Sequence, residues 1–116
     1  IWGWRLGGQK VIIDTDPGID DALALALAVA SGMDVVGVTT CHGNGGIENT
    51  STNAKVMMRL LNKPSVPVHK GSPHPLKTFT VAHATHSGET VHGSDGMGEC
   101  RPPLEPQDSV FGEESA

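Results

Sequence analysis

The sequence predicts an α/β fold in which flanking helices cover a Rossmann-like parallel sheet. Short β-branched runs alternate with longer segments of helix-forming residues between positions 10 and 69. The first two runs end in polar residues, and glycines follow each of them. Strands separated by helices connect through crossovers, which makes the strands parallel and gathers their carboxyl ends at one edge of the sheet.

The first strand is predicted at residues 10–14, where Lys-Val-Ile-Ile-Asp is followed by a turn at Gly18. A helix is predicted from Asp20, because a long run of alanine and leucine follows acids in its first turn. Gly32 suits the position just after this helix, where a left-handed conformation is common. Strong helix formers occupy every face of the segment, so we expect it to be buried nearly all round.

The same pattern repeats in the next part of the chain. A strand is predicted at 34–40, running into a glycine-rich loop at 41–46 that suits close backbone approach. A helix with one apolar face is predicted from near Glu48 until Pro64 stops it, and a short third strand at 66–69. The apolar positions of that helix have the spacing i, i+3, i+4 and i+7, with both methionines filling the core: Ala54, Met57, Met58 and Leu61.

The part of the chain after residue 64 has a different character. Every proline but Pro17 lies at or beyond residue 64, and apolar periodicity is weak there. We expect loops with little regular structure, which serve either as an active-site loop or as a segment whose packing partners are missing.

Charge and hydropathy exclude several classes of partner. Lysine and arginine number 8 against 13 acids, for a net charge of −5, and no basic stripe is present, which argues against nucleic acid. No apolar run approaches the roughly 20 residues that cross a bilayer, and residues 1–10 lack a signal-peptide pattern. Cys41 and Cys100 lie far apart without a CxxC motif, which fits a reducing compartment. We therefore expect a cytoplasmic protein that does not bind membranes.

Four aspartates lie within eight residues at the predicted junction of first strand and first helix: Asp14, Asp16, Asp20 and Asp21. Two carboxylates about 6 Å apart repel by roughly 3 kcal/mol at an effective dielectric near 20, so the cluster favours raised pKa values or a bound cation. Oxygen ligands favour Ca²⁺ or Mg²⁺ over zinc. Helix capping is the alternative, but it accounts for Asp20 and Asp21 only.

Asn44 and His92 each have a functional and a plain structural interpretation. Asn44 lies between two glycines, which is a turn signature at any strand end, so spacing alone does not decide its role. A single histidine beside a glycine, as at His92, is more often a solvated loop residue than a base. The remaining histidines show no metal-ligand spacing and receive no site role: His42, His69, His74, His83 and His86.

Three motifs, in order, resemble the inosine-uridine preferring nucleoside hydrolase family. They are Asp-Thr-Asp-Pro-Gly-Ile-Asp-Asp at 14–21, Thr-Thr-Cys-His-Gly-Asn at 39–44 and His-Gly-Ser-Asp-Gly-Met-Gly at 92–98. The resemblance runs from about Lys10 to Gly98 and covers only the first part of a family member. It implies that residues 1–9 are an N-terminal extension and that residues 10–116 are the N-terminal part of a truncated nucleoside hydrolase domain, with an incomplete version of that fold.

The resemblance implies a catalytic Ca²⁺ site. The position matching Asp16 holds Ca²⁺ and takes a proton from the attacking water, while the position matching Asp21 is a second metal ligand. Asp14 matches a supporting acid near the metal. Hydrolysis of an N-glycosidic bond passes through an oxocarbenium-like sugar and needs a nucleophilic water, which a metal and a carboxylate base can together supply.

The resemblance also implies the substrate. Asp20 and Asn44 match positions that bind ribose hydroxyls, and His92 matches a histidine close to the bound nucleoside. The implied substrate is a purine or pyrimidine ribonucleoside, cleaved to ribose and free base in nucleoside catabolism. A homo-oligomer is compatible with the full-length protein.

Two alternatives stay open at this point. A haloacid-dehalogenase-like phosphatase also has an Asp-x-Asp motif after its first strand and binds Mg²⁺, but Pro17 and Gly18 depart from the Gly-Thr pattern expected there. The second alternative is a non-catalytic remnant that binds a metal or a partner through an exposed sheet edge. The family's later ligands and leaving-group acid are absent, so we expect these 116 residues alone to be catalytically silent and unstable or aggregation-prone.

Overall fold

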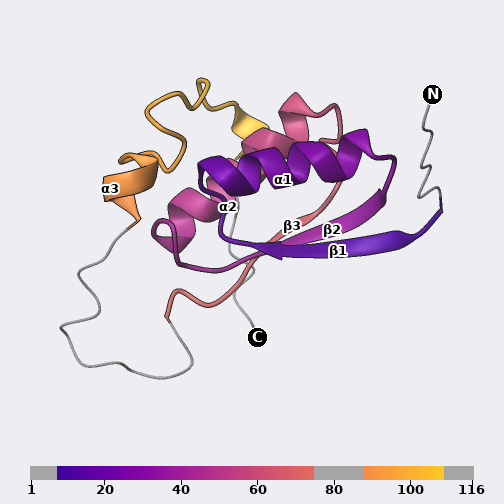
Figure 1. Cartoon of the computed structure of the whole chain (residues 1–116), viewed down its shortest axis with the longest axis horizontal. Coiled ribbons are helices and arrows are strands. Elements are labelled where there is room, and N and C mark those ends of the chain that lie inside the picture. Colours follow the sequence, from indigo (N-terminus) through magenta and orange to yellow (C-terminus); the bar gives the residue numbers. More distant parts are fainter. Residues whose placement is uncertain (1–7, 75–87, 109–116) are drawn as a thin grey trace.

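A computed structural model describes residues 8–74 and 88–108 of the chain. Its centre is a three-stranded sheet in the order β1-β2-β3, in which both strand pairs are parallel. The strands are β1 (Lys10–Thr15), β2 (Asp34–Thr40) and β3 (Val68–Lys70). Two helices lie over one face of this sheet (Figure 1). The predicted α/β fold with a parallel sheet is confirmed.

The strands end level with one another at one edge. Thr15 is paired with Thr40, and Thr40 with Lys70, so the segments that follow β1 and β2 leave the sheet side by side. The third strand begins two residues later than predicted, because the N–H of Val66 donates to the carbonyl of Lys63 in a turn. The sheet starts at the expected residue 10, while the proposed division into an extension and a domain stays a prediction.

The two long helices start within one residue of the predicted positions, and the second ends at Leu60, before Pro64 is reached. Helix α1 (Ile19–Ala30) is followed by Gly32 at φ +80°, the left-handed position expected just after a helix. Helix α2 (Ile47–Leu60) begins beside the glycine-rich loop and ends before Pro64.

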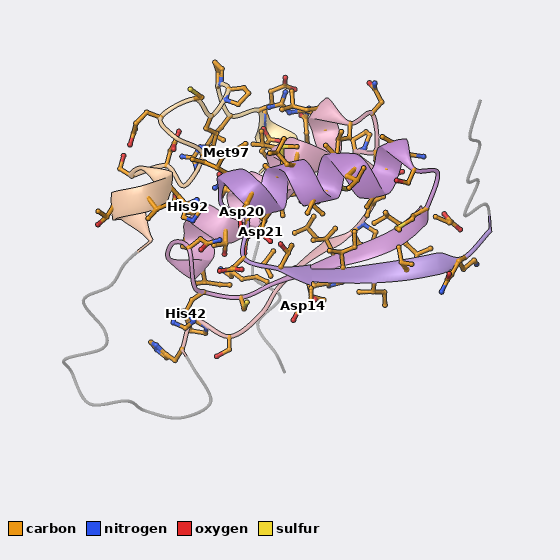
Figure 2. The ribbon with its side chains drawn as sticks, in the orientation of Figure 1. Asp14, Asp20, Asp21, His42, His92 and Met97 are labelled. Carbon is orange, nitrogen blue, oxygen red and sulfur yellow. The ribbon has the colours of Figure 1, made fainter. Side chains whose placement is uncertain are left out.

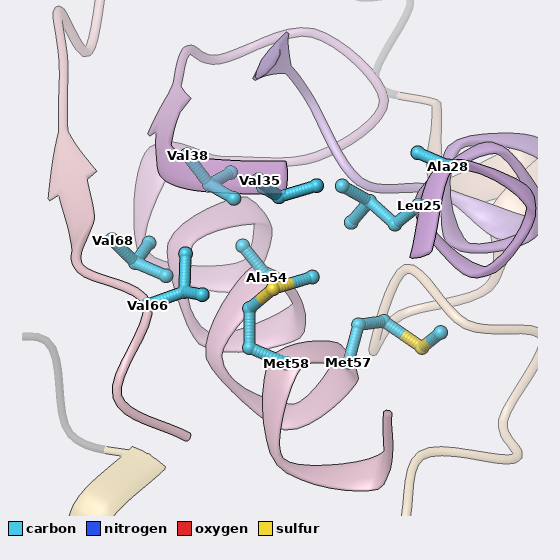
Figure 3. Close-up of a cluster of buried hydrophobic side chains, with 9 residues drawn as sticks. All are labelled: Leu25, Ala28, Val35, Val38, Ala54, Met57, Met58, Val66 and Val68. Carbon is cyan, nitrogen blue, oxygen red and sulfur yellow. The ribbon is translucent and has the colours of Figure 1, made fainter. Parts of the chain in front are cut away.

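The apolar core lies between the sheet and these two helices (Figure 3). Helix α1 contributes Leu25 and Ala28, and β2 contributes Val35 and Val38. The other members come from α2, the following turn and β3: Ala54, Met57, Met58, Val66 and Val68. Both methionines are buried, as the apolar spacing of α2 predicted.

The prediction that α1 is buried nearly all round is wrong. Only Leu25 and Ala28 are buried in this helix, while Leu23 and Leu27 are 69% and 68% exposed. The reason is that the sheet and α2 contact one side of α1 and leave its opposite side open. Ile12 in β1 is similarly 68% exposed, so the outer face of the sheet is also open at that strand.

We expect Leu27→Lys to leave the free energy of unfolding within about 0.5 kcal/mol of the wild-type value, because Leu27 is already 68% exposed. The same substitution should reduce self-association, since it breaks an exposed apolar stripe. Urea unfolding followed by circular dichroism and sedimentation velocity measure the two effects. A loss of more than about 1 kcal/mol would show instead that this face is covered in solution.

Beyond β3 the described chain has little regular structure, as predicted. It contains a single helical turn, α3 (Glu89–His92), and a short 3₁₀ turn, η2 (Pro106–Asp108). Helix α3 lies beside the start of α1, and η2 packs against α2 (Figure 1). Within the described ranges, no helix is long and apolar enough to cross a membrane.

Candidate functional site

The candidate site lies where β1 and β2 end. The Cys41 N–H donates to the carbonyl of Thr15, so the loops after the two strands begin in contact. Helix α1 starts four residues after β1, and its first turn carries Asp20 and Asp21 (Figure 2). The first two sequence motifs therefore meet at one edge of the sheet, as the parallel topology requires.

Asn44 holds the two predicted metal ligands together. Its backbone N–H donates to Asp16 Oδ2 at 2.8 Å, and its side-chain Nδ2 donates to Asp21 Oδ2 at 2.9 Å. The same Nδ2 also donates to the carbonyl of Asp16 at 3.1 Å. Asn44 is therefore more than a turn residue, because it fixes both acids through its backbone and its amide.

Two neighbouring residues that sequence reasoning missed complete this cluster. The hydroxyl of Thr15 donates to Asp21 Oδ1 at 2.7 Å, which leaves each oxygen of Asp21 with one protein donor. Burial raises the pKa of the Cys41 thiol, and the negative charges of Asp16, Asp14 and Asp21 raise it further. The raised pKa keeps Cys41 a neutral thiol, which is a poor nucleophile. The only hint of Thr15 in the sequence was its place between two acids.

Asp14 is set apart from the other acids. It is exposed, and its Oδ1 accepts a hydrogen bond from the Thr39 hydroxyl at 2.6 Å. Strand alternation places it on the same sheet face as Ile12, away from α1 (Figure 2). Its supporting role, which would rest on charge rather than contact, stays a prediction.

Asp20 and His92 lie together at the start of α1 (Figure 2). His92 Nδ1 accepts a hydrogen bond from the Ile19 N–H at 3.1 Å, so this nitrogen carries no proton and the neutral ring is protonated at Nε2. The 3.9 Å separation between Nδ1 and Asp20 Oδ1 is consequently not an ion pair. Asp20 is 80% exposed and remains available to a ligand.

The acids fit part of a site for a hard cation. Within the described ranges, no lysine or arginine pairs with Asp14, Asp16 or Asp21, so their charges have only hydrogen-bond donors around them. Their donor atoms are all oxygens, which suits Ca²⁺. Across those same ranges, no group of three or more His, Cys, Asp and Glu side chains is arranged to hold a metal. His83 and His86 lie outside the described residues.

A parallel sheet with carboxylates and an amide at its carboxyl edge defines the class of α/β proteins that bind a polar ligand outside the strand ends. The sequence model of the inosine-uridine preferring nucleoside hydrolase family matches residues 11–115. The chain belongs to this family, as its three motifs predicted. Membership decides against the phosphatase alternative.

The comparisons with individual proteins agree. A probable uridine nucleosidase 2 of Oryza sativa subsp. japonica is 46% identical over 91 residues, which make up 78% of this chain and 26% of that protein. An uncharacterized protein in the ribF 3′ region of Corynebacterium ammoniagenes is 42% identical over 92 residues, or 78% of this chain and 95% of that protein. A solved plant nucleoside hydrolase, PpNRh1, matches with a TM-score of 0.70 at 30% identity and covers 92% of this chain.

The chain spans only a part of the longer relatives. It covers 26%, 30% and 27% of three curated relatives, and 32% of the solved plant enzyme. The structure is thus part of a nucleoside hydrolase fold, in agreement with the incomplete fold predicted from the motifs.

Proposed function

We propose that this chain carries the metal- and ribose-binding part of a nucleoside hydrolase, which cleaves purine or pyrimidine ribonucleosides to ribose and free base. The observation that supports it most directly is the convergence of Asp16, Asp21 and Asn44 through three hydrogen bonds at the sheet edge. The relatives named as uridine nucleosidases point to the same activity.

Asp16 is the proposed general base. Asn44 occupies its Oδ2, while within the described ranges Oδ1 has no protein donor and is free to accept a proton from water. A carboxylate held in this way is oriented before the substrate arrives, which lowers the cost of proton transfer. The negative charges of the cluster also favour the positive charge that develops on the sugar.

Asp20, Asn44 and His92 are the proposed substrate-binding residues. The exposed carboxylate of Asp20 can accept hydrogen bonds from ribose hydroxyls. The Nδ1 of His92 accepts from the backbone of Ile19, so His92 carries its donor on Nε2, which has no hydrogen-bond acceptor within residues 8–74 and 88–108. A Cβ built on Gly18 would lie 2.6 Å from His92 Nδ1 and 2.9 Å from Asn44 Nδ2, so both side chains adjoin the start of α1. Asn44 already donates its Nδ2 to Asp16 and Asp21, which leaves its Oδ1 for the ligand.

Ca²⁺ is the proposed cofactor, held here by Asp16 and Asp21. When bound, Ca²⁺ lowers the pKa of a water molecule and orients the ribose diol. Two carboxylates offer fewer than the six to eight oxygens that Ca²⁺ usually takes, so we expect the chain alone to bind it weakly and to release no ribose. Asp14 is proposed to support the site through its charge. We also propose a cytoplasmic location, because Cys41 and Cys100 are free thiols and thiols stay reduced in the cytoplasm.

The test is a calorimetric Ca²⁺ titration of the chain beside the double variant Asp16→Asn, Asp21→Asn. Asp34→Asn is the matched control, since Asp34 is an exposed acid at the opposite end of the sheet. We expect binding in the wild type and the control, and none in the double variant. A ribose-release assay on inosine and uridine accompanies the titration.

Each outcome has a definite meaning. Equal Ca²⁺ binding by all three proteins would overturn the metal site and favour the alternative that the chain is a non-catalytic remnant. Ca²⁺-dependent ribose release would show that the chain assembles a complete site, and release that survives Asp16→Asn would overturn the role of Asp16 as base.

A further inference from the structure

Helix α2 carries a polar face directed at the loop after α3. Asn49 and Asn53 lie one turn apart, and Asn53 is fully buried. Asn49 Nδ2 donates to the carbonyl of Ser94 at 2.9 Å, and Asn53 Nδ2 donates to the carbonyl of Asp95 at 2.9 Å. A buried amide is costly unless its hydrogen bonds are satisfied, so this contact is specific rather than incidental.

The second hydrogen of the Asn53 amide is donated to the turn that follows β1. Nδ2 also donates to the carbonyl of Pro17 at 3.1 Å, next to the proposed base Asp16. Arg101 Nη1 donates to Asn53 Oδ1 at 3.0 Å, which fixes the amide with its nitrogen toward the two carbonyls. Asn53 therefore has every donor and one acceptor position in use.

The loop that Asn53 holds is also stabilised by its own hydrogen bonds. The carboxylate of Asp95 accepts the N–H groups of Met97 and Glu99 at 2.7 and 3.0 Å, and that of Arg101 at 3.0 Å. Burial alone would raise the pKa of Asp95, but these N–H donors and the charge of Arg101 hold it below the ordinary value. The Gly98 N–H then donates to the carbonyl of His92 at 2.7 Å, which connects the loop to His92.

We infer that Asn53 is a positioning residue that sets His92 and the Asp16–Pro17 turn at their places in the site. It is the buried amide that joins the Pro17 carbonyl to the Asp95 carbonyl, and each of these belongs to a segment that carries a proposed site residue. Loss of the amide frees the loop, and the hydrogen bond from the Ile19 N–H to His92 Nδ1 loses its support. The expected effect of Asn53 on catalysis rests on the proposed function, whereas its expected effect on the position of His92 does not.

The test compares Asn53→Ala with Val56→Ala, a fully buried control in the same helix that removes packing but no hydrogen bond. The readout is the separation between the ¹⁵N chemical shifts of the two His92 ring nitrogens, assigned with a His92→Asn variant. We expect this separation to narrow in Asn53→Ala, because the ring tautomers mix once Nδ1 loses its donor, and to stay unchanged in Val56→Ala. We also expect Ca²⁺ binding to weaken by about tenfold in Asn53→Ala only, because the turn that carries Asp16 loses the amide that holds the neighbouring Pro17 carbonyl.

Equal His92 spectra in the two variants would overturn the inference and leave Asn53 as an ordinary core residue. If Asn53→Ala fails to fold, Asn53→Leu keeps a side chain of similar shape and removes both Nδ2 donors, and an unchanged His92 spectrum there also overturns the inference. A wild-type chain that binds no Ca²⁺ would refute the proposed metal site, but the ¹⁵N comparison needs neither metal nor turnover and decides the inference separately.

Discussion

Replacing Asp108 with alanine is expected to lower the free energy of unfolding by about 3 kcal/mol, the cost of breaking a buried ion pair from one side. Asp108 is 1% exposed and accepts a bidentate pair of hydrogen bonds from Arg59. Arg59 Nε donates to Oδ1 at 3.1 Å and Nη2 donates to Oδ2 at 2.9 Å. The N–H of Glu105 adds a third donor at 2.9 Å. These bonds hold η2 against α2, so their loss should free the end of the described chain.

Two variants control this prediction. Glu105→Gln removes only the outer partner of Arg59, a carboxylate that is 49% exposed, and should cost less than about 1 kcal/mol. Asp108→Asn keeps the shape of the side chain and removes its charge. Urea unfolding at neutral pH measures all three, and a loss below about 1 kcal/mol in Asp108→Ala would show that the clamp contributes little.

The same ion pair makes stability depend on pH with a definite sign. Burial alone would raise the pKa of Asp108, but the hydrogen bonds from Arg59 and Glu105 and the charge of Arg59 hold that pKa below its ordinary value. A depressed pKa stabilises the folded state above the unfolded-state value of about 3.9. The difference in unfolding free energy between the wild type and Asp108→Asn should therefore be constant at neutral pH and shrink as the pH falls below about 4.

The order of strands and helices was predictable because it rests on local periodicity. The β-branched run of β2 and the spacing of Ala54, Met57 and Met58 in α2 each lie within one short segment. The burial of α1 was not predictable in this way, since the sequence of a helix does not show which neighbours cover it. Leu25 and Leu27 look alike in the sequence, and only the packed structure separates them.

The candidate site shows the same division. Asp16, Asp21 and Asn44 could be predicted to meet, because parallel strands end at one edge of the sheet. Asp14 clusters with them in sequence, but the two-residue period of β1 turns it to the other face. Asn53 left no local signal, since its partners lie 36 and 42 residues away in the chain.

The ion pair between Arg59 and Asp108 was missed for the same reason, because 49 residues separate the two. The proline-rich composition around Asp108 correctly indicated little regular structure. Composition does not reveal which helix such a segment packs against. Contacts of this kind order a chain segment without any periodic pattern in its sequence.

Gly43→Ala is expected to weaken Ca²⁺ binding by about tenfold, because a methyl group at residue 43 would overlap the carboxylate of Asp16. A Cβ built on Gly43 would meet Asp16 Oδ2 and would lie 2.9 Å from its Cγ, so the carboxylate or the loop must move. Overpacking of this kind costs about 1–3 kcal/mol, and about 1.4 kcal/mol corresponds to a factor of ten in affinity. The glycine is required here by the close approach of the two loops, since its backbone is not in the left-handed region.

Gly45→Ala is the matched control, two residues further along the same loop. A Cβ there would meet only Asn49 Cβ at 3.6 Å, an ordinary contact, so we expect Ca²⁺ affinity and unfolding free energy close to those of the wild type. Calorimetric titration and urea unfolding of both variants separate displacement of Asp16 from general damage to the loop. Wild-type affinity in Gly43→Ala would mean that Asp16 does not hold the ion, and an equal loss in both variants would assign the effect to the loop as a whole.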